Sequence, residues 1–590
     1  GHFRSCTTMS RVSQVSKDVP ENKLPKSVQQ DDGTWVGKGG EGHKFRNGPD
    51  AGPKPGDTVV VVGAGPSGIH MAHILKKRGV NPIILEAGNR VGGKVCTVVH
   101  DNVPHEMGAC YITPEYWVLK DLLKEYGIIN DIVKLPDRDI YLEDTSKHPE
   151  EIIDGLGVWA KRTVKEHFVD QKAPLASSLP DGAFGPHFIL HLKRFQVAHR
   201  RVMGGSTGTY HGMMPPRPSP EAMKELTQPF DQFLRDNKCQ AIEKMMLIAV
   251  TSQGYGRLDQ VPTYLALTWF TAEFAEAFLQ TILNPKSAEP VITLFRGGHL
   301  KLFQKMVEKD QLDVRLMHEV RKIERGPGGV KVSGVRPGAG CAGGSSTFTV
   351  AGTHVFVACP FVPIAKAFSL TPQEKRVISD LRPNTFCTHL VERAPRGTGN
   401  PNNAVSSWPD RLVPSSRMWN LANMYAERWS WRAVGTKPEL AVANPRNVFE
   451  QYSDNASKPW DPAQICISAD AEVAADKPTE GKQVVVCNQF VEEGQSRLPD
   501  GSIDVAFLRK RLDEELKLQG VSDYRVIKSF PWDYFWHNSA EGIKDGLPWD
   551  ILEMQGDNRT FWIGGSACFE SINDVTNYNR ELMHHFLPPQ

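Results

Sequence analysis

The 590-residue sequence predicts an α/β fold, in which a Rossmann-like dinucleotide-binding domain is interrupted by a discontinuous second domain of mixed helix and sheet. Two observations predict it. A strand, a glycine-rich turn, a helix and a second strand follow one another in residues 58–86. Strand-like segments bounded by glycines return at 291–365 and 550–590, after long stretches of different character. We therefore expect three separated segments to build one nucleotide-binding domain.

The first segment carries a dinucleotide fingerprint. The apolar β-branched run 59–62 predicts a strand buried on both faces, and it leads directly into a turn that holds Gly63, Gly65, Ser67 and Gly68. The first glycine permits the tight turn, the second admits a pyrophosphate close to the backbone, and the third lets the next helix lie against the strand. Glu86 follows the second strand, where its carboxylate would accept hydrogen bonds from a ribose and repel the extra phosphate of NADP.

The segment Arg90-Val91-Gly92-Gly93-Lys94 comes immediately after this acidic residue. It resembles the flavin-containing amine oxidase superfamily, in which a glycine pair and a basic residue follow the dinucleotide motif. The resemblance implies an FAD-binding domain of the amine oxidase type, with Gly93 and Lys94 as further cofactor contacts. Nicotinamide is the lesser alternative.

The same resemblance implies other FAD contacts. Glu106-Met107-Gly108-Ala109 would pass beside the flavin, unless it is a plain turn, and the backbone of Val320 would touch the adenine. Near the end, Gly565 and Ser566 would form a turn on the phosphate side. A helix over Asp574–Met583 would point its N-terminus at the isoalloxazine carbonyls, where its dipole favours electron density, with Val575 offering the first N–H.

The regions between these segments show other patterns. Helical periodicity predicts helices over Glu221–Leu234 and Tyr264–Leu283, and residues 396–445 have no clear period. We divide the chain into a flexible leader (1–56), three parts of the FAD-binding domain (57–111, 291–365 and 550–590) and two parts of a substrate domain (112–290, mainly helical, and 366–549).

The sequence also departs from the amine oxidases. Those enzymes place a lysine near flavin N5, whereas the nearest counterpart here, Thr385–Pro395, offers only Glu392 and Arg393. Ser566 and Asp574 occupy the positions where an acidic and an aromatic residue are common. These departures make amine oxidation the less expected activity.

The pattern Gly565-Ser566-x-x-Phe569-Glu570, with the earlier Tyr534-Phe535, is more similar to the branch of polyunsaturated fatty acid double-bond isomerases. The resemblance implies hydride abstraction from a bis-allylic carbon and its return elsewhere at flavin N5, so no side chain is assigned as catalytic. The alternatives are a flavin oxidase of polyamines or aromatic amines that releases hydrogen peroxide, and a non-enzymatic flavin-stabilised scaffold.

A fatty acid would need an apolar tunnel and a cation for its carboxylate. We expect the tunnel wall to include Tyr534, Trp536 and Phe569. Ordinary packing in the protein core is the alternative role for these aromatic residues and for their neighbours. Candidate wall residues are also Trp532, Phe535, Tyr255-Gly256, Val261–Tyr264 and Trp269-Phe270; candidate anchors are Arg257, Arg296 and Arg393.

Composition limits the remaining partners. A net charge of +1 gives no footprint for nucleic acid, and no apolar run is long enough to span a bilayer. Ten cysteines without C-x-x-C pairs predict neither a metal site nor a disulfide scaffold. The first residue is Gly1, so a targeting segment for the secretory pathway or an organelle is compatible with this soluble chain, and the compartment and a homo-oligomer stay open.

Overall fold

The computed structural model describes residues 27–29, 35–37, 44–100, 103–134, 140–143, 152–154, 156–203, 217–251, 253–284, 291–295, 298–337, 344–393, 419–420, 448–452, 472–473, 483–491, 496–518 and 523–589. Most of the predicted leader, the 396–445 segment except for one two-residue strand, and Arg296 lie outside these residues.

A five-stranded parallel sheet organises the nucleotide-binding side of the molecule. Its strand order is β12-β5-β4-β16-β23, with bounds Asp313–Arg315, Asn81–Leu85, Thr58–Val62, Val355–Val357 and Thr560–Trp562. Every neighbouring pair is parallel. Segments from three distant parts of the sequence therefore share one sheet, and the predicted α/β fold class is confirmed.

The carboxyl ends of all five strands of this sheet are level with one another, and Arg315 at the end of β12 pairs with Leu85. Val62 pairs with both Leu85 and Val357, and Val357 pairs with Trp562. The residues that follow these strands consequently emerge along the same edge, which is where open parallel sheets bind ligands.

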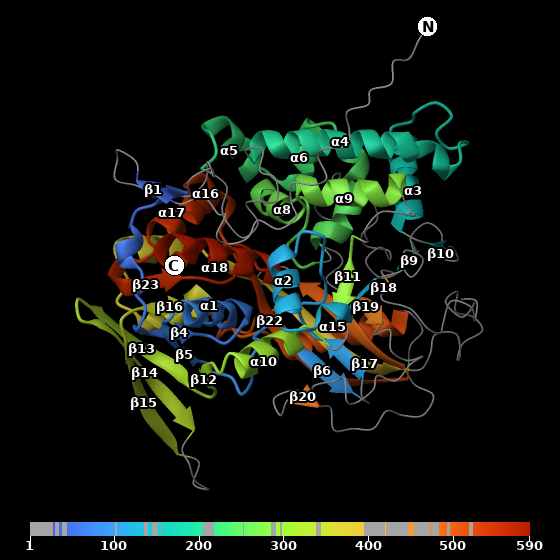
Figure 1. The fold of residues 1–590 in the computed structure, drawn as a ribbon. Coiled ribbons are helices and arrows are strands. Elements are labelled where there is room, and N and C mark those ends of the chain that lie inside the picture. The colour runs from blue at the N-terminus through green and yellow to red at the C-terminus, as the bar shows by residue number, and fades with distance from the viewer. Residues whose placement is uncertain are drawn as a thin grey trace.

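Three helices pack beside this sheet. α1 (Pro66–Lys77) contacts both α18 (Ile572–Phe586) and α10 (Leu300–Lys309). α1 and α18 are joined by Asn579, whose side-chain amide donates to the carbonyl oxygen of Ser67 at 2.7 Å. The start of α1 is thus fixed against α18, about five hundred residues later in the sequence (Figure 1).

A second, larger sheet lies on the other side of the molecule. Its strand order is β10-β9-β18-β19-β21-β17-β22, and the longest pairings join β17 (Arg382–Arg393) to β21 (Gln483–Val491) and β22 (Tyr524–His537). The other members are β9 (Ile140–Glu143), β10 (Ile152–Asp154), β18 (Trp419–Asn420) and β19 (Val448–Tyr452). A three-stranded antiparallel sheet, β13 (Glu319–Gly326), β14 (Gly329–Pro337) and β15 (Ser345–Gly352), projects from the nucleotide-binding side.

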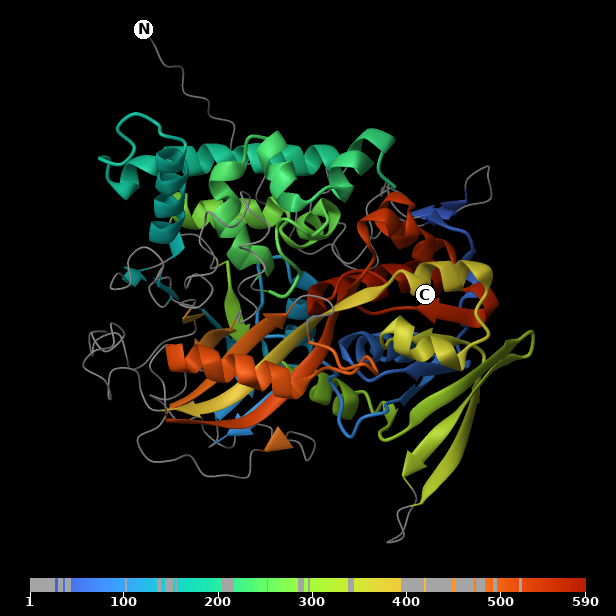
Figure 2. The same ribbon diagram turned by 180° about the vertical axis from the view of Figure 1, so that it is seen from behind.

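A layer of helices covers one end of the molecule (Figures 1 and 2). It contains α3 (Leu156–Asp170), α4 (Gly185–Val202), α5 (Pro220–Thr227), α6 (Phe230–Asp236), α7 (Glu243–Met246), α8 (Thr263–Trp269) and α9 (Ala272–Leu283).

Two long helices were predicted in this layer, and both predictions were wrong because each span contains two helices. The prediction over Glu221–Leu234 is two helices, because Pro229 cannot donate an intrahelical hydrogen bond. The prediction over Tyr264–Leu283 is also two, because the hydroxyl of Thr271 caps a new helix by accepting from the N–H of Phe274 at 2.9 Å.

Shorter elements complete the described chain: β1 (Ser27–Gln29), β2 (Trp35–Gly37), β3 (Lys44–Phe45), β6 (Thr97–His100), β7 (Val103–Glu106), α2 (Trp117–Glu125), β8 (Ile132–Lys134), β11 (Thr293–Phe295), α11 (Phe361–Ile364), α12 (Pro372–Ser379), β20 (Glu472–Val473), α15 (Val505–Leu518), α16 (Ala540–Lys544) and α17 (Leu547–Glu553). None of the helices in the described residues has the length and apolarity needed to cross a bilayer.

Candidate flavin and substrate site

A cavity of about 350 Å³ opens at the carboxyl edge of the parallel sheet and extends to the larger sheet. One part of its lining is backbone-rich and comes from the nucleotide-binding segments: Gly63, Gly65, Pro66, Ser67, Glu86, Gly93, Lys94, Val95, Gly108, Ala109, Ala358–Pro360, Gly564–Ser566 and Ser571–Val575 in part. The other part is aromatic: Tyr111, Tyr116, Tyr255, Trp269, Phe386, Trp532, Tyr534 and Trp536. A dinucleotide region and an apolar region therefore share one space.

The glycine turn has the shape that the fingerprint requires. Gly63 has φ of +108°, a left-handed conformation that favours glycine. A Cβ on Gly68 would lie 1.9 Å from the carbonyl oxygen of Gly63, so the helix–strand contact leaves no room for a side chain. α1 begins at Pro66, directly after Gly65, and presents its N-terminus to the cavity.

Glu86 is held by the same turn. Its carboxylate accepts hydrogen bonds from the N–H groups of Ala64 and Gly88, each at 2.7 Å. A carboxylate offers about four lone-pair positions, so acceptor capacity for ribose hydroxyls remains. Its position in the cavity lining is the one that the fingerprint predicts for an NAD-type or FAD-type ribose partner.

The second glycine pair packs closely against the first. The Cα atoms of Gly93 and Gly65 are neighbours, since a Cβ on Gly93 would lie 3.2 Å from the Cα of Gly65. A Cβ on Gly108 would lie 1.8 Å from the carbonyl oxygen of Lys94. Ala109 lines the cavity beside it. These contacts require glycine because backbone meets backbone.

Lys94 and Glu570 form an ion pair in the cavity wall. The ammonium group also lies 5.8 Å from the ring centre of Tyr534, and the second carboxylate oxygen of Glu570 accepts from the backbone N–H of Trp536 at 3.2 Å. The two side chains are only 27% and 15% exposed. Their opposite charges therefore largely cancel toward the cavity.

The C-terminal segment closes the cavity through a turn and a helix. Gly564 has φ of +93°, and the hydroxyl oxygen of Ser566 is buried with no hydrogen-bond partner among the described residues. α18 begins at Ile572, two residues before the predicted start, because the hydroxyl of Ser571 accepts from the N–H of Asp574 at 3.0 Å.

This helix start corrects the role predicted for Val575. Val575 lines the cavity, but its N–H already donates to the carbonyl of Ser571 at 3.2 Å. The amides of Ile572 and Asn573 precede that first intrahelical hydrogen bond and are the ones available at the helix N-terminus.

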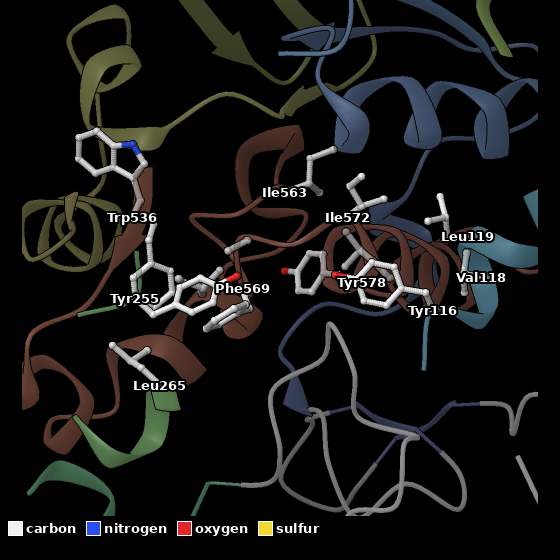
Figure 3. Packing of buried hydrophobic residues seen from close by; sticks show 14 of the residues in the cluster. Tyr116, Val118, Leu119, Tyr255, Leu265, Trp536, Ile563, Phe569, Ile572 and Tyr578 are labelled. Atoms are coloured by element: carbon white, nitrogen blue, oxygen red, sulfur yellow. The ribbon is translucent and has the colours of Figure 1, made fainter. Parts of the chain in front are cut away.

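Aromatic side chains from three regions meet in the other half of the cavity. The ring of Tyr255 lies 5.1 Å from that of Trp269, 5.8 Å from that of Tyr534 and 4.8 Å from that of Phe569. Figure 3 shows Tyr255 beside Phe569, and it shows Trp536 at the end of β22. Phe569 is 2% exposed and lies behind the wall, so it supports the lining residues.

β22 has a bulge within the aromatic stretch that lines the cavity. The pairing of β17 with β22 shifts between Arg382 and Asn384, and Phe535 has φ of +55°, a strained value for a bulky residue. Tyr534 and Trp536, on either side, both line the cavity. The indole nitrogen of Trp536 is buried without a partner among the described residues.

The ionisable groups of the aromatic half are neutral. Burial raises the pKa of Tyr255 and of Tyr534 well above the usual value, and the two hydroxyls hydrogen-bond each other. Burial likewise raises the pKa of Tyr111 and of Tyr116. These hydroxyls remain protonated at physiological pH.

Burial also disfavours ionisation of two cysteines, Cys359 in the cavity lining and Cys568 outside it. Burial raises the pKa of the Cys359 thiol to about 12 and that of Cys568 well above its ordinary value. A nucleophilic thiolate is therefore disfavoured at both positions.

Several predicted residues lie elsewhere. Val320 is buried in β13 and outside the cavity lining, although two residues earlier the N–H of His318 donates to the carbonyl of Glu86 at 2.7 Å. Arg257 is paired with Asp259 through Nε at 2.9 Å and does not line the cavity. The carboxylate of Glu392 is buried and bound by Arg525.

The strand that carries Glu392 meets the cavity at another residue. Phe386 lines the cavity and its ring lies 5.3 Å from that of Tyr534. Arg393 ends the same strand seven residues later, which is about 23 Å away along a strand. Phe386 and Asn488 were not predicted, because alternation along a strand shows two faces without showing which one meets a ligand. Tyr111 and Tyr116 were not predicted either; they lie between β7 and α2, where no periodic pattern marks a face.

Sequence comparison defines the family. The family model of flavin containing amine oxidoreductases matches residues 66–432. The chain belongs to this family. The family is flavin-containing, and its cofactor is FAD, as the sequence predicted.

Curated relatives of the flavoprotein include isomerases and oxidases. The polyenoic fatty acid isomerase of Ptilota filicina is 26% identical over 219 residues, which cover 36% of this chain and 41% of that protein. Amine oxidase A of Sus scrofa is 41% identical over 71 residues, 12% of this chain and 14% of that protein. The matched part of the chain thus spans at most 41% of the length of these relatives.

Solved structures share the fold over most of its length. The CLA-producing fatty acid isomerase from P. acnes superposes with a TM-score of 0.61 at 17% identity, covering 90% of this chain and 99% of that one. A putrescine oxidase superposes with a TM-score of 0.53 at 14% identity, covering 89% and 97%. At these identities the likeness concerns the fold.

The cavity suits FAD at both ends. Close backbone contacts at Gly63, Gly68 and Gly108 form a cradle that a Cβ would fill, and Glu86 offers acceptors for a ribose. At the other end, the Ser566 hydroxyl and the Trp536 indole nitrogen are buried polar atoms with no partner in the described part of the chain. Such atoms are costly unless a ligand or water satisfies them.

Proposed function

We propose that this flavoprotein moves double bonds of a polyunsaturated fatty acid into conjugation. Among the residues that the structure describes, the cavity lining is rich in aromatic and small side chains, with the neutral amides of Gln253 and Asn488. Its carboxylate Glu86 lies at the nucleotide end, and its cation Lys94 is matched by Glu570. The observation that carries the proposal is this neutral, aromatic wall beside the expected flavin position. It favours an unsaturated hydrocarbon over an ammonium ion.

Bound FAD supplies a hydride acceptor and donor at N5, so a bis-allylic C–H can lose and regain hydride with no net oxidation. The protein's own contribution is orientation and exclusion of water. Rings of Tyr255, Trp269 and Phe386 offer flat apolar faces for a polyene, and the N-terminus of α18 with Ile572 and Asn573 favours negative charge on the reduced cofactor.

Proton transfer by a side chain is not part of the proposal. Burial raises the pKa values of Tyr255 and Tyr534. Phe386 lies in the cavity lining on β17, the strand that resembles the lysine-bearing strand of the amine oxidases. Tyrosine hydroxyls that stay protonated are consistent with hydride movement inside one substrate molecule.

The test compares two substrate classes with the FAD-loaded protein. Linoleate and arachidonate are expected to give conjugated-diene and conjugated-triene absorbance without oxygen uptake. Polyamines and aromatic amines are expected to give neither. Oxygen uptake with peroxide release on an amine, together with no conjugated product from several polyenoic acids, would establish the oxidase alternative and reject the isomerase.

A further inference from the structure

The outer side of α4 combines cations with exposed apolar side chains. This helix, Gly185–Val202, contains four lysines and arginines, three histidines and no acidic residue. Its exposed positions recur every three or four residues and include His187, Leu190, Arg194 and Val197. Recurrence at this spacing places them on one face of the helix.

Exposed apolar residues are concentrated in this part of the molecule. Six of the nine large apolar side chains that the described residues expose lie between positions 169 and 283. Among them are Leu175 at 74% exposure, in the turn region between α3 and α4, and Val197 at 68%. Soluble proteins scatter such residues singly, so a concentration marks an interaction surface.

A pocket of about 370 Å³ lies on the same face, between α3 and α4. Its ionisable lining groups are all bases, and its apolar lining comes from Phe168 and Leu190. The full lining is His167, Phe168, His187, Leu190, His191, Arg194, Lys238 and Gln240. A pocket with basic and apolar walls suits an anion that carries hydrocarbon.

Two cations of this pocket have no counter-charge within the described chain. Lys193, Arg200 and Arg201 are paired with carboxylates of α9 and α5. No described carboxylate lies within 4.0 Å of Arg194 or of Lys238; instead, Arg194 donates to the carbonyl of Lys238 at 3.2 Å. These two cations are therefore not neutralised by direct contact with a described carboxylate.

His191 provides a second, independent indication of a ligand. It is 6% exposed, it lines the pocket, and its Nδ1 has no hydrogen-bond partner among the described residues. Burial, followed by the nearby Arg194 and the histidines His167 and His187, lowers its pKa to about 4. An anion drawn into the pocket would favour the protonated ring, which donates from this nitrogen.

We propose that the α3–α4 face docks this protein on the surface of a bilayer that contains anionic lipids. A lipid phosphate would occupy the pocket beside Arg194 and Lys238, while Leu175, Leu190 and Val197 enter the boundary between headgroups and acyl chains. Cations alternating with exposed apolar side chains fit an anionic bilayer, which offers both charge and hydrocarbon.

The geometry of the molecule is compatible with this orientation. α4 lies at one end, and the β13–β15 sheet projects at the opposite end (Figures 1 and 2). The docking proposal is independent of the proposed activity, because binding to vesicles is measured without turnover.

The experiment is co-sedimentation of the FAD-loaded protein with vesicles of phosphatidylcholine, alone or mixed with phosphatidylglycerol. Binding is expected only to the mixed vesicles and is expected to weaken with added salt. Each cation near an anionic surface strengthens binding about fivefold, so Arg194→Gln with Lys238→Gln should lower the partition coefficient about 25-fold. Leu175→Ser with Val197→Ser should lower it at least about tenfold.

A matched control removes the same charge elsewhere. Arg321→Gln with Lys322→Gln alters two exposed cations of β13 and should leave vesicle binding unchanged. Flavin content and thermal midpoint confirm that each variant is folded. Binding to neither vesicle, equal binding to both, or equal loss in the control would overturn the proposal, as would binding of the pocket to inorganic phosphate alone with no vesicle binding.

Discussion

The two halves of the cavity are built by different means. The nucleotide half consists of backbone that approaches backbone, at Gly63, Gly68 and Gly108. The substrate half consists of aromatic rings whose positions depend on how β17, β22 and the helical layer pack together. The first half tolerates almost no change, whereas the second tolerates changes that preserve neutrality and shape. Each prediction below tests one side of this difference.

The largest effect is expected in the glycine turn. In Gly68→Ala the new Cβ would lie 1.9 Å from the carbonyl oxygen of Gly63, so α1 must move away from the strand and its N-terminus from the pyrophosphate. Purified protein should retain less than about a tenth of the FAD absorbance per chain. The control Gly182→Ala, which has no atom within 4 Å of the new Cβ, should keep its full flavin content. Retention of FAD in Gly68→Ala would refute the tight-cradle account.

The second largest effect is expected at the ion pair of Lys94 and Glu570. Glu570→Gln leaves Lys94 without its counter-charge in a partly buried wall, and we expect conjugated-product formation to fall about 30-fold. Lys94→Met combined with Glu570→Gln should recover most of that loss, because the cavity is neutral again. Rates of the single and double variants form a double-mutant cycle. Additive losses would show that neutrality is irrelevant.

Adding a charge tests the aromatic half directly. Phe386→Lys introduces an ammonium group at the cavity-facing position of β17 and should lower turnover of a polyenoic acid at least about tenfold. Phe386→Leu keeps the position apolar and should change turnover less than about threefold. Both rates are measured as conjugated-diene formation at saturating substrate. Equal effects of the two substitutions would mean that only ring shape matters there.

The smallest effect concerns the tyrosine hydroxyls. Burial raises the pKa of Tyr255 and Tyr534, so both stay protonated as the pH rises from about 7 to about 9, and no activity is lost through their ionisation. Tyr534→Phe should retain turnover within about threefold and the same flat pH profile. A pH-dependent limb in the unaltered protein that disappears in Tyr534→Phe would instead identify this hydroxyl as an acid or base.

The nucleotide half could be predicted from sequence because its rules are local. Gly63, Gly65, Gly68 and Glu86 stand within one strand–turn–helix–strand unit, and the structure brings them to one edge of a parallel sheet. The start of α18 was also readable, since Ser571 followed by Asp574 three residues later is a typical capping pattern. Overlooking that pattern led to the wrong role for Val575.

The substrate half could not be predicted to the same degree. Phe386 reaches the cavity because β17 pairs with β21 on one side and β22 on the other, with a bulge at Phe535. That register depends on contacts between residues more than a hundred positions apart. The arginines predicted to bind a substrate carboxylate could not be assessed from sequence either. Arg257 forms an ion pair with Asp259, and Arg393 lies at the far end of β17 from the cavity.

The most direct test of the neutral hydride-transfer site uses linoleate deuterated at its bis-allylic carbon, mixed with unlabelled linoleate. The proposed function predicts conjugated product in which deuterium has moved to another carbon of the same molecule, with no peroxide formed. Loss of the deuterium to water, accompanied by oxygen consumption and an oxidised product, would contradict the account.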